Sequence, residues 1–378
     1  MLQRTILIIE TMFIEHISTE VILFFILYGI TGVVPLVAAV YLLLRRGNAF
    51  APDVTPPVRL RRWAASFFAV AALGHVWWFL FLIYSSDLHS ASYVVTGMVD
   101  CVGMLTTIAG TLLAMLQDRK RPVWPVVTAL IPYVVIGALY MVWPDEHYLY
   151  IAIAYILLLY VIFTVYMVFA VKRYGRWLND NYADLENKKV WLSQVVSLVC
   201  LLLFILYALV DTDSILIYIL HLIELMLFVL LLWRVETLPT LQEETQVQKL
   251  SAPLPAREGQ GGESLAHIER LLAKHCVDTQ LYLQHDLTLQ QLAQTIGTNR
   301  SYLSQYFSRQ GITYNTYINN LRINHFISHY QEVAAAGQPV VAQRLASESG
   351  YRSYSTFSLA FKQRTGLNLT AWMRQSAE

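Results

Sequence analysis

Near the C-terminus, the residues from Gly350 to Gly366 read GYRSYSTFSLAFKQRTG. The segment before it, Val341 to Ser349, carries apolar residues at helical spacing, and the glycine that follows can end this helix in a left-handed conformation because it has no Cβ. Ser353 can cap a second helix, on which Phe357 and Phe361 share one face. Two short helices joined by a glycine turn, the second with small polar groups and a cation on its outer face, are typical of a helix-turn-helix that fits a DNA major groove.

The same pattern occurs a second time upstream, where residues Leu287 to Phe307 read LTLQQLAQTIGTNRSYLSQYF. The buried stripe predicted for its first helix consists of Leu289, Leu292, Ala293 and Ile296. Gly297 then provides the turn, and Asn299 or Thr298 caps a helix that points Leu303 and Phe307 inward. The sequence therefore predicts two helix-turn-helix units.

The pair of units and the signature between Gly350 and Gly366 resemble a known family. Residues Leu281 to Arg374 resemble the DNA-binding domain of AraC/XylS-type bacterial transcription regulators, in which a long helix, here about Tyr314 to Glu332, joins the two units. This chain has Leu369 where that family usually has Pro. The resemblance implies an all-α C-terminal domain that binds promoter DNA.

Helical position and the resemblance together indicate which side chains face DNA. Those expected at base edges are Ser301, Ser304 and Gln305 in the first unit, and Tyr354, Ser355, Ser358 and Leu359 in the second. Those expected at phosphates are Arg300, Arg309, Arg352 and Lys362. Among the base readers, Gln305 is suited to a bidentate contact with adenine. Base discrimination is therefore expected to depend mainly on the first unit.

The composition of the whole chain indicates a membrane protein. Hydrophobic residues make up 56% of the chain and charged residues 14%, and the mean hydropathy is +0.47. Because about 20 apolar residues span a bilayer as a helix, the long apolar runs before Val235 predict seven spans. They are Thr19 to Leu44, Trp63 to Ser85, Ala91 to Met115, Val123 to Trp143, Tyr148 to Val171, Val190 to Val210 and Ser214 to Trp233. The expected fold class is all-α, a seven-helix transmembrane bundle followed by a soluble AraC-type domain.

The distribution of Lys and Arg predicts the orientation of these spans. The first, third and fifth loops are basic, whereas the alternate loops, at 87–90, 144–147 and 211–213, have no Lys or Arg. Basic loops stay in the cytoplasm, so the N-terminus is expected outside and the C-terminal domain inside. The resemblance to bacterial regulators implies that the membrane is the bacterial cytoplasmic membrane.

The predicted domains are an N-terminal extension (1–18), a transmembrane sensor domain (19–233), a flexible linker (234–263) and the DNA-binding domain (264–378). The linker is rich in Pro, Gly, Gln and Glu, and its root-mean-square reach is on the order of 30 Å. Such a segment transmits small movements poorly. The sequence therefore favours control by dimerisation of the bundle, with proteolytic release as the alternative.

Four ionisable residues lie well inside the predicted spans, away from their ends: His75, Asp100, His221 and Glu224. All four fall roughly 10 to 15 Å below the outer surface at 1.5 Å per helical residue. Because such groups are costly in hydrocarbon, they predict a polar ligand or proton site in the outer half of the bundle. The alternative is that they only tie helices together by hydrogen bonds. We expect no metal here, because an H-x-x-x-H or paired-His spacing is absent.

The sequence as a whole predicts a membrane-bound one-component transcription regulator, not an enzyme, with no cofactor and no catalytic residues. The alternative is a transporter or enzyme in the membrane with a regulatory DNA-binding domain. The expected partners are double-stranded promoter DNA, the lipid bilayer and a small-molecule signal. We further expect a homodimer on DNA and a contact with RNA polymerase.

Overall fold

The computed structural model describes residues 19–45, 47–84, 91–185, 188–207, 216–241 and 261–377. Over these ranges the chain is helical, with no β-strand and one isolated bridge between Tyr182 and Thr288. The all-α fold predicted from the sequence is confirmed. The predicted extension 1–18 and most of the predicted linker, residues 242–260, lie outside the described residues.

The chain forms two compact units. Unit 1 comprises Met1–Val171 and Val190–Leu241, and unit 2 comprises Lys172–Lys189 and Gln242–Glu378. The predicted domain boundaries are not tested by this division and stay predictions. One difference concerns Lys172–Lys189, which the sequence assigned to a loop of the membrane domain and which belongs to the unit that holds the helix-turn-helix motifs.

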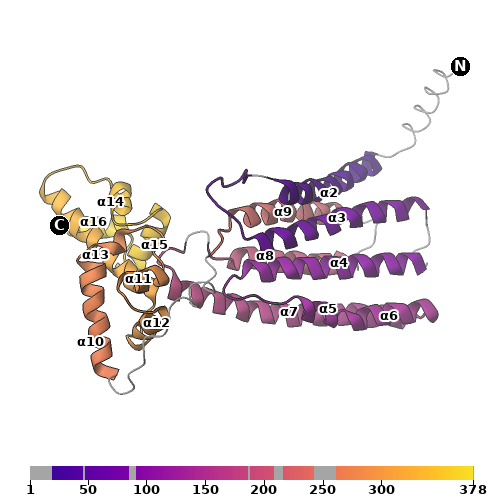
Figure 1. Ribbon diagram of the computed structural model, residues 1–378. Coiled ribbons are helices and arrows are strands. Elements are labelled where there is room, and N and C mark those ends of the chain that lie inside the picture. Colours follow the sequence, from indigo (N-terminus) through magenta and orange to yellow (C-terminus); the bar gives the residue numbers. More distant parts are fainter. Residues whose placement is uncertain are drawn as a thin grey trace. The chain divides into compact units, whose positions relative to one another are not determined.

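Unit 1 is built from helices that run alongside one another (Figure 1). They are α2 (Thr19–Leu44), α3 (Val58–Tyr84), α4 (Ala91–Met115), α5 (Trp124–Ala129), α6 (Ile131–Val142), the first part of α7 (Glu146–Asn181), α8 (Trp191–Tyr207) and α9 (Leu216–Thr237). Helix α3 packs against α2, α4 and α9, and α9 also packs against α2 and α8. Helices α5 and α6 follow directly on one another, with a break at Leu130.

Six helical segments among the described residues are long and apolar enough to cross a membrane. They are Ile22–Leu44, Val58–Phe81, Val94–Met115, Trp124–Val142, Glu146–Asn181 and Ile217–Thr237. Of the seven predicted spans, the one at Val190 to Val210 is described only as α8, 17 residues long, because residues 208–215 lie outside the described part. The fifth predicted span ends at Val171, whereas α7 continues as helix to Asn181.

The surface of unit 1 is apolar, as expected for helices that face lipid. Large exposed side chains include Leu43, Leu73, Trp124 and Phe169, all more than 60% exposed. The interior contains many small residues, among them Ala38, Ala39, Ala64, Ala65, Ala71 and Ala72. In a membrane no hydrophobic driving force brings helices together, so they associate by close packing, which small residues allow. Exposed apolar patches of this extent favour a membrane as the surroundings of unit 1.

Unit 2 contains the C-terminal helices. They are α10 (Gly261–Leu272), α11 (Leu289–Thr295), α12 (Arg300–Arg309), α13 (Tyr314–Ala335), α14 (Ala342–Glu348), α15 (Tyr354–Thr365) and α16 (Leu369–Ala377), with a π turn at Ala273–Val277 and a 3-10 turn at Leu281–Leu283. The predicted long helix is α13, and it joins two hydrophobic cores. Tyr314 and Ile318 belong to the first core, and Ile323 and Phe326 belong to the second. Leu369, which stands in place of the family's usual Pro, begins α16 and is buried in the second core.

A buried cation lies where the two cores meet. Arg322 on α13 is 1% exposed, and its guanidinium donates from Nε to the Tyr282 carbonyl at 2.7 Å and from Nη2 to the Gln284 carbonyl at 2.8 Å. It also lies 5.4 Å from the centroid of the Tyr351 ring. Burial lowers the pKa of Arg322 from its ordinary value. Arg322 thus bonds to carbonyls that precede the first motif and contacts a ring in the turn of the second motif, so it fixes the two motifs relative to each other.

Candidate nucleic-acid interface

The first helix-turn-helix consists of α11 and α12, and its sequence explains each boundary. Thr288 caps α11 in a capping box, because its hydroxyl accepts from the Gln291 backbone N–H at 3.2 Å and the Gln291 side chain accepts from the Thr288 N–H at 2.9 Å. Gly297 turns the chain with φ +74°. Asn299 then caps α12, as its Oδ1 accepts from the Tyr302 N–H at 2.9 Å. Of the two predicted caps, Asn299 and not Thr298 occupies the position.

The second helix-turn-helix consists of α14 and α15. Gly350 has φ +86°, and a Cβ at this position would lie 2.7 Å from the carbonyl oxygen of Leu283, so no other residue fits here without a backbone shift. Ser353 caps α15 by accepting from the Thr356 N–H at 3.3 Å. Phe357 and Phe361 are both fully buried, as their spacing predicts. The predicted second motif therefore forms as expected.

Most of the predicted DNA contacts lie on the outer faces of α12 and α15. The exposed residues among them are Ser301, Ser304, Gln305 and Arg309 on α12, together with Arg352 before α15 and Tyr354, Ser355, Leu359 and Lys362 on it, while Ser358 is half-buried. Leu359 is 51% exposed although it is apolar. A face of this composition can present hydrogen-bond donors, acceptors and cations to a groove. That these residues contact DNA stays a prediction.

Two of the predicted phosphate contacts are engaged within unit 2. Arg300 is half-buried and donates from Nε and Nη2 to Asn181 Oδ1, at 2.9 and 2.5 Å. Arg352 forms an ion pair with Asp286, whose second oxygen lies 3.2 Å from Lys188 Nζ. Both arginines are thus linked to the segment at the end of α7: Arg300 directly through Asn181, and Arg352 through Asp286, which also pairs with Lys188. Phosphate would compete with these partners for the guanidinium nitrogen atoms that hold them.

The segment that holds them, Asn181–Leu185 together with Lys188, is here named the docked segment. Its backbone joins the first motif through a bond from the Ala183 N–H to the Leu287 carbonyl at 3.2 Å. Asn315 on α13 donates from Nδ2 to the carbonyls of Tyr182 and Ala183, at 3.1 and 2.6 Å. The Ala183 side chain is 2% exposed and is part of the first core. The docked segment is thus an integral part of unit 2.

Sequence reasoning missed the docked segment. It predicted a basic loop between the fifth and sixth spans, and its only signals were Lys188 and a polar run, Asn179 to Asn181. Neither signal says what the loop contacts. The role of Arg322 was also missed, because a buried arginine looks like any other cation in a sequence.

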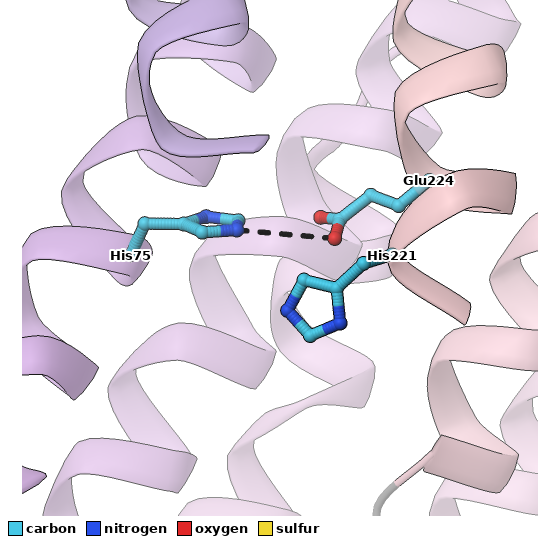
Figure 2. Close-up of side chains that lie close together, drawn as sticks. All are labelled: His75, His221 and Glu224. Carbon is cyan, nitrogen blue, oxygen red and sulfur yellow. Dashed lines mark ion pairs between the residues drawn. The ribbon is translucent and has the colours of Figure 1, made fainter. Parts of the chain in front are cut away.

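The four ionisable residues predicted to lie within the membrane fall into two groups. His75 on α3 and both His221 and Glu224 on α9 are close together, with one potential ligand atom from each lying within 4.8 Å of the others. Figure 2 shows His75 and Glu224 pointing toward each other from the two helices, with the His221 ring beside them. Asp100 on α4 is held separately, since its Oδ2 accepts from Trp78 Nε1 at 3.1 Å. The predicted set of four is therefore a cluster of three with Asp100 outside it.

Comparison with known proteins gives one match. A family model for a helix-turn-helix domain of the AraC type matches residues 292–375, which include both α12 and α15. No curated protein and no solved structure matches the chain. The C-terminal part thus carries an AraC-type helix-turn-helix domain, which indicates a DNA-binding transcription regulator. The family model does not extend to the apolar helices of unit 1.

Proposed function

We propose that this protein is a membrane-bound one-component transcription regulator. In this proposal unit 1 is embedded in the bacterial cytoplasmic membrane and responds to a signal, and unit 2 binds promoter DNA through α12 and α15. The observation that carries the proposal is that the described part of one chain contains two helix-turn-helix units, with exposed polar faces on α12 and α15, and six helical segments long and apolar enough to cross a membrane. A catalytic role is not required by any of these features.

The proposed orientation places the N-terminus outside the cell and unit 2 in the cytoplasm. It is supported by the charged loops: Arg45, Arg59 and Arg121, on one predicted side, contrast with the connection at 144–147, which contains no Lys or Arg. This orientation gives unit 2 access to chromosomal DNA. A reporter enzyme fused after Glu378 should therefore be active in the cytoplasm and inactive outside.

The docked segment offers a path for the signal that the linker does not. Helix α7 is continuous from Glu146 to Asn181, and Asn181 holds the predicted phosphate contact Arg300. Lys188 pairs with one oxygen of Asp286 and Arg352 with the other, so a shift of Lys188 would change the strength of the Arg352 ion pair. A displacement of the end of α7 would thus change how freely two cations reach DNA. This path complements the homodimer that we propose on DNA, in which association of two chains raises the effective concentration of the second unit.

The experiment that tests this function is sequencing of the DNA that is cross-linked to the full-length protein in cells. Genomic fragments recovered with the wild-type chain should share a sequence motif, and the Gln305→Ala variant should recover fewer of them. The protein should also sediment with membranes after a high-salt wash. Recovery of random genomic DNA, equal for both chains, would overturn the proposal.

A further inference from the structure

His75, His221 and Glu224 of unit 1 form a cluster of potential metal ligands. A hydrogen bond that only ties helices together does not explain the spacing of these side chains. The His75 Nε2 and Glu224 Oε2 atoms are 3.8 Å apart, which is longer than a hydrogen bond. The three potential ligand atoms lie within 4.8 Å of one another. In a tetrahedral zinc site such atoms are about 3.4 Å apart, because the metal–ligand bonds are about 2.0 to 2.1 Å long. A decrease of about 1.4 Å in the longest distance between two ligand atoms would therefore be enough for all three to bind one ion.

The backbone fixes the proton positions on both imidazoles. His75 Nδ1 lies 2.9 Å from the Ala71 carbonyl oxygen, and His221 Nδ1 lies 2.8 Å from the Ile217 carbonyl oxygen. A carbonyl only accepts, so in each neutral ring Nδ1 carries the proton and Nε2 carries the lone pair. A metal-binding histidine commonly donates its other ring N–H to a carbonyl in this way. Both rings are therefore in the tautomer that binds a metal through Nε2.

The surroundings hold His75 in place. The Tyr28 hydroxyl on α2 donates to the His75 carbonyl oxygen at 2.7 Å, and the Tyr28 ring lies 5.1 Å from the His75 ring. A Cβ at Gly74 would lie 2.6 Å from Asp100 Oδ1, so the glycine next to His75 allows α4 to approach α3. The backbone that bears His75 is thus constrained by two neighbouring helices. Such constraint is what keeps ligands ordered before an ion arrives.

Burial and charge decide which kind of ion fits. The side chains of His75 and Glu224 are 13% and 26% exposed, and His221 is 5% exposed. Two neutral imidazoles and one carboxylate suit zinc and related divalent transition metals, whereas Ca²⁺ and Mg²⁺ prefer more oxygen ligands. A divalent cation also compensates the carboxylate charge, which is costly inside a membrane.

We propose that His75, His221 and Glu224 bind one divalent transition-metal ion of the zinc class between α3 and α9. With three protein ligands the ion keeps an open position for water or another ligand. That the ion is the signal of the regulator rests on the proposed function. Metal binding itself does not, because it is measured on the protein without DNA.

The test uses the full chain purified in detergent, stripped with a chelator and then supplied with Zn²⁺ or Co²⁺ alone. Elemental analysis after gel filtration should find one ion per chain, and Co²⁺ should give the visible absorption of a tetrahedral site. Glu224→Gln and His221→Ala should each raise the dissociation constant by more than tenfold, since loss of an outer-shell partner already costs about 10- to 100-fold.

Two control variants distinguish this site from adventitious binding. His329→Ala removes a solvent-accessible histidine of unit 2 that lies within 3.5 Å of Glu332 and 3.1 Å of Glu348. Asp100→Asn removes an acidic group of unit 1 that lies outside the cluster. Both should keep the stoichiometric ion. The proposal is overturned if the wild type holds no stoichiometric ion, or if the ion is lost in His329→Ala and kept in Glu224→Gln. Because Glu224→Gln preserves side-chain size, its effect does not depend on a loss of folding.

Discussion

Replacement of Asn181 by alanine should make the protein bind DNA more tightly. In the structure the Asn181 side-chain oxygen accepts two bonds from the guanidinium of Arg300, at 2.9 and 2.5 Å. Arg300 is predicted to hold a DNA phosphate at the start of α12. The Nε–H and the Nη2–H that donate to Asn181 are not available to a phosphate at the same time, so the bond to Asn181 competes with a bond to DNA through this edge of the guanidinium.

The size of the effect follows from the bonds that are lost. A hydrogen bond to a charged group contributes about 1.5 to 3 kcal/mol net. Because Arg300 is half-buried and regains water when it is released, we take the lower end, about 1.5 kcal/mol, which corresponds to slightly more than about a tenfold change in affinity. Asn181→Asp should act in the opposite direction. It turns the contact into an ion pair worth about 0.2 to 1 kcal/mol more, so DNA binding should weaken by up to about fivefold.

The assay is fluorescence anisotropy of a labelled promoter duplex with the full chain in detergent at one fixed salt concentration. The matched control is Asn324→Ala, which changes an exposed asparagine on α13 and should leave the affinity as it is. In an Arg300→Ala background the effect of Asn181→Ala should disappear, since the two residues act through one contact. Weaker binding by Asn181→Ala, or an equal effect in both backgrounds, would refute the competition between Asn181 and DNA.

Three further predictions concern unit 2. Gln305→Ala should lower discrimination at one base pair by about 1 to 3 kcal/mol. Arg309→Ala should instead weaken binding to all duplexes and reduce the slope of log affinity against log salt concentration by about 0.9. Equal losses of affinity on specific and random DNA in both variants would contradict this division of roles. Gly350→Ala should destabilise unit 2 by more than the roughly 1 to 2 kcal/mol that a non-glycine residue costs in the left-handed conformation, because its Cβ would also lie 2.7 Å from a backbone oxygen. Gly297→Ala, which has open space around it, should cost only the conformational penalty. Thermal unfolding followed by tryptophan fluorescence compares the two variants, and equal losses of stability would contradict the geometry at Gly350. Burial, and after it the nearby imidazole of His329, lowers the pKa of His325 below its ordinary 6.5. The unfolded chain therefore takes up the proton at a higher pH than the folded chain, and stability should fall as the pH drops below 6.5. The same unfolding assay should give a flatter pH profile for His325→Gln, and an unchanged profile would exclude His325 as the cause.

Local patterns allowed the helices and both motifs to be predicted. The caps Asn299 and Ser353 and the turns at Gly297 and Gly350 each depend on residues within a few positions in the sequence. Their physics is local, so the sequence reveals it. The apolar runs likewise located the candidate spans, because length and hydropathy are properties of single segments.

Contacts between distant segments could not be predicted in the same way. The bond between Asn181 and Arg300 joins residues 119 positions apart, and neither residue belongs to a motif that names the other. Hydropathy also ended the fifth span at Val171, although α7 continues to Asn181, because polar residues can extend a helix beyond the apolar run. In unit 1 the depth of His75, Asp100, His221 and Glu224 could be counted, but the sequence does not show which faces of α3, α4 and α9 meet.

The most direct test of a membrane-embedded regulator is DNA binding by the full chain in lipid nanodiscs. Nanodiscs that carry the protein should bind a duplex selected from cells at least about 10³-fold more tightly than a scrambled duplex. The footprint should show two protected segments about one helical turn apart, one for each recognition helix. Equal affinity for the selected and scrambled duplexes, or protein that binds DNA only after it leaves the lipid, would contradict the account.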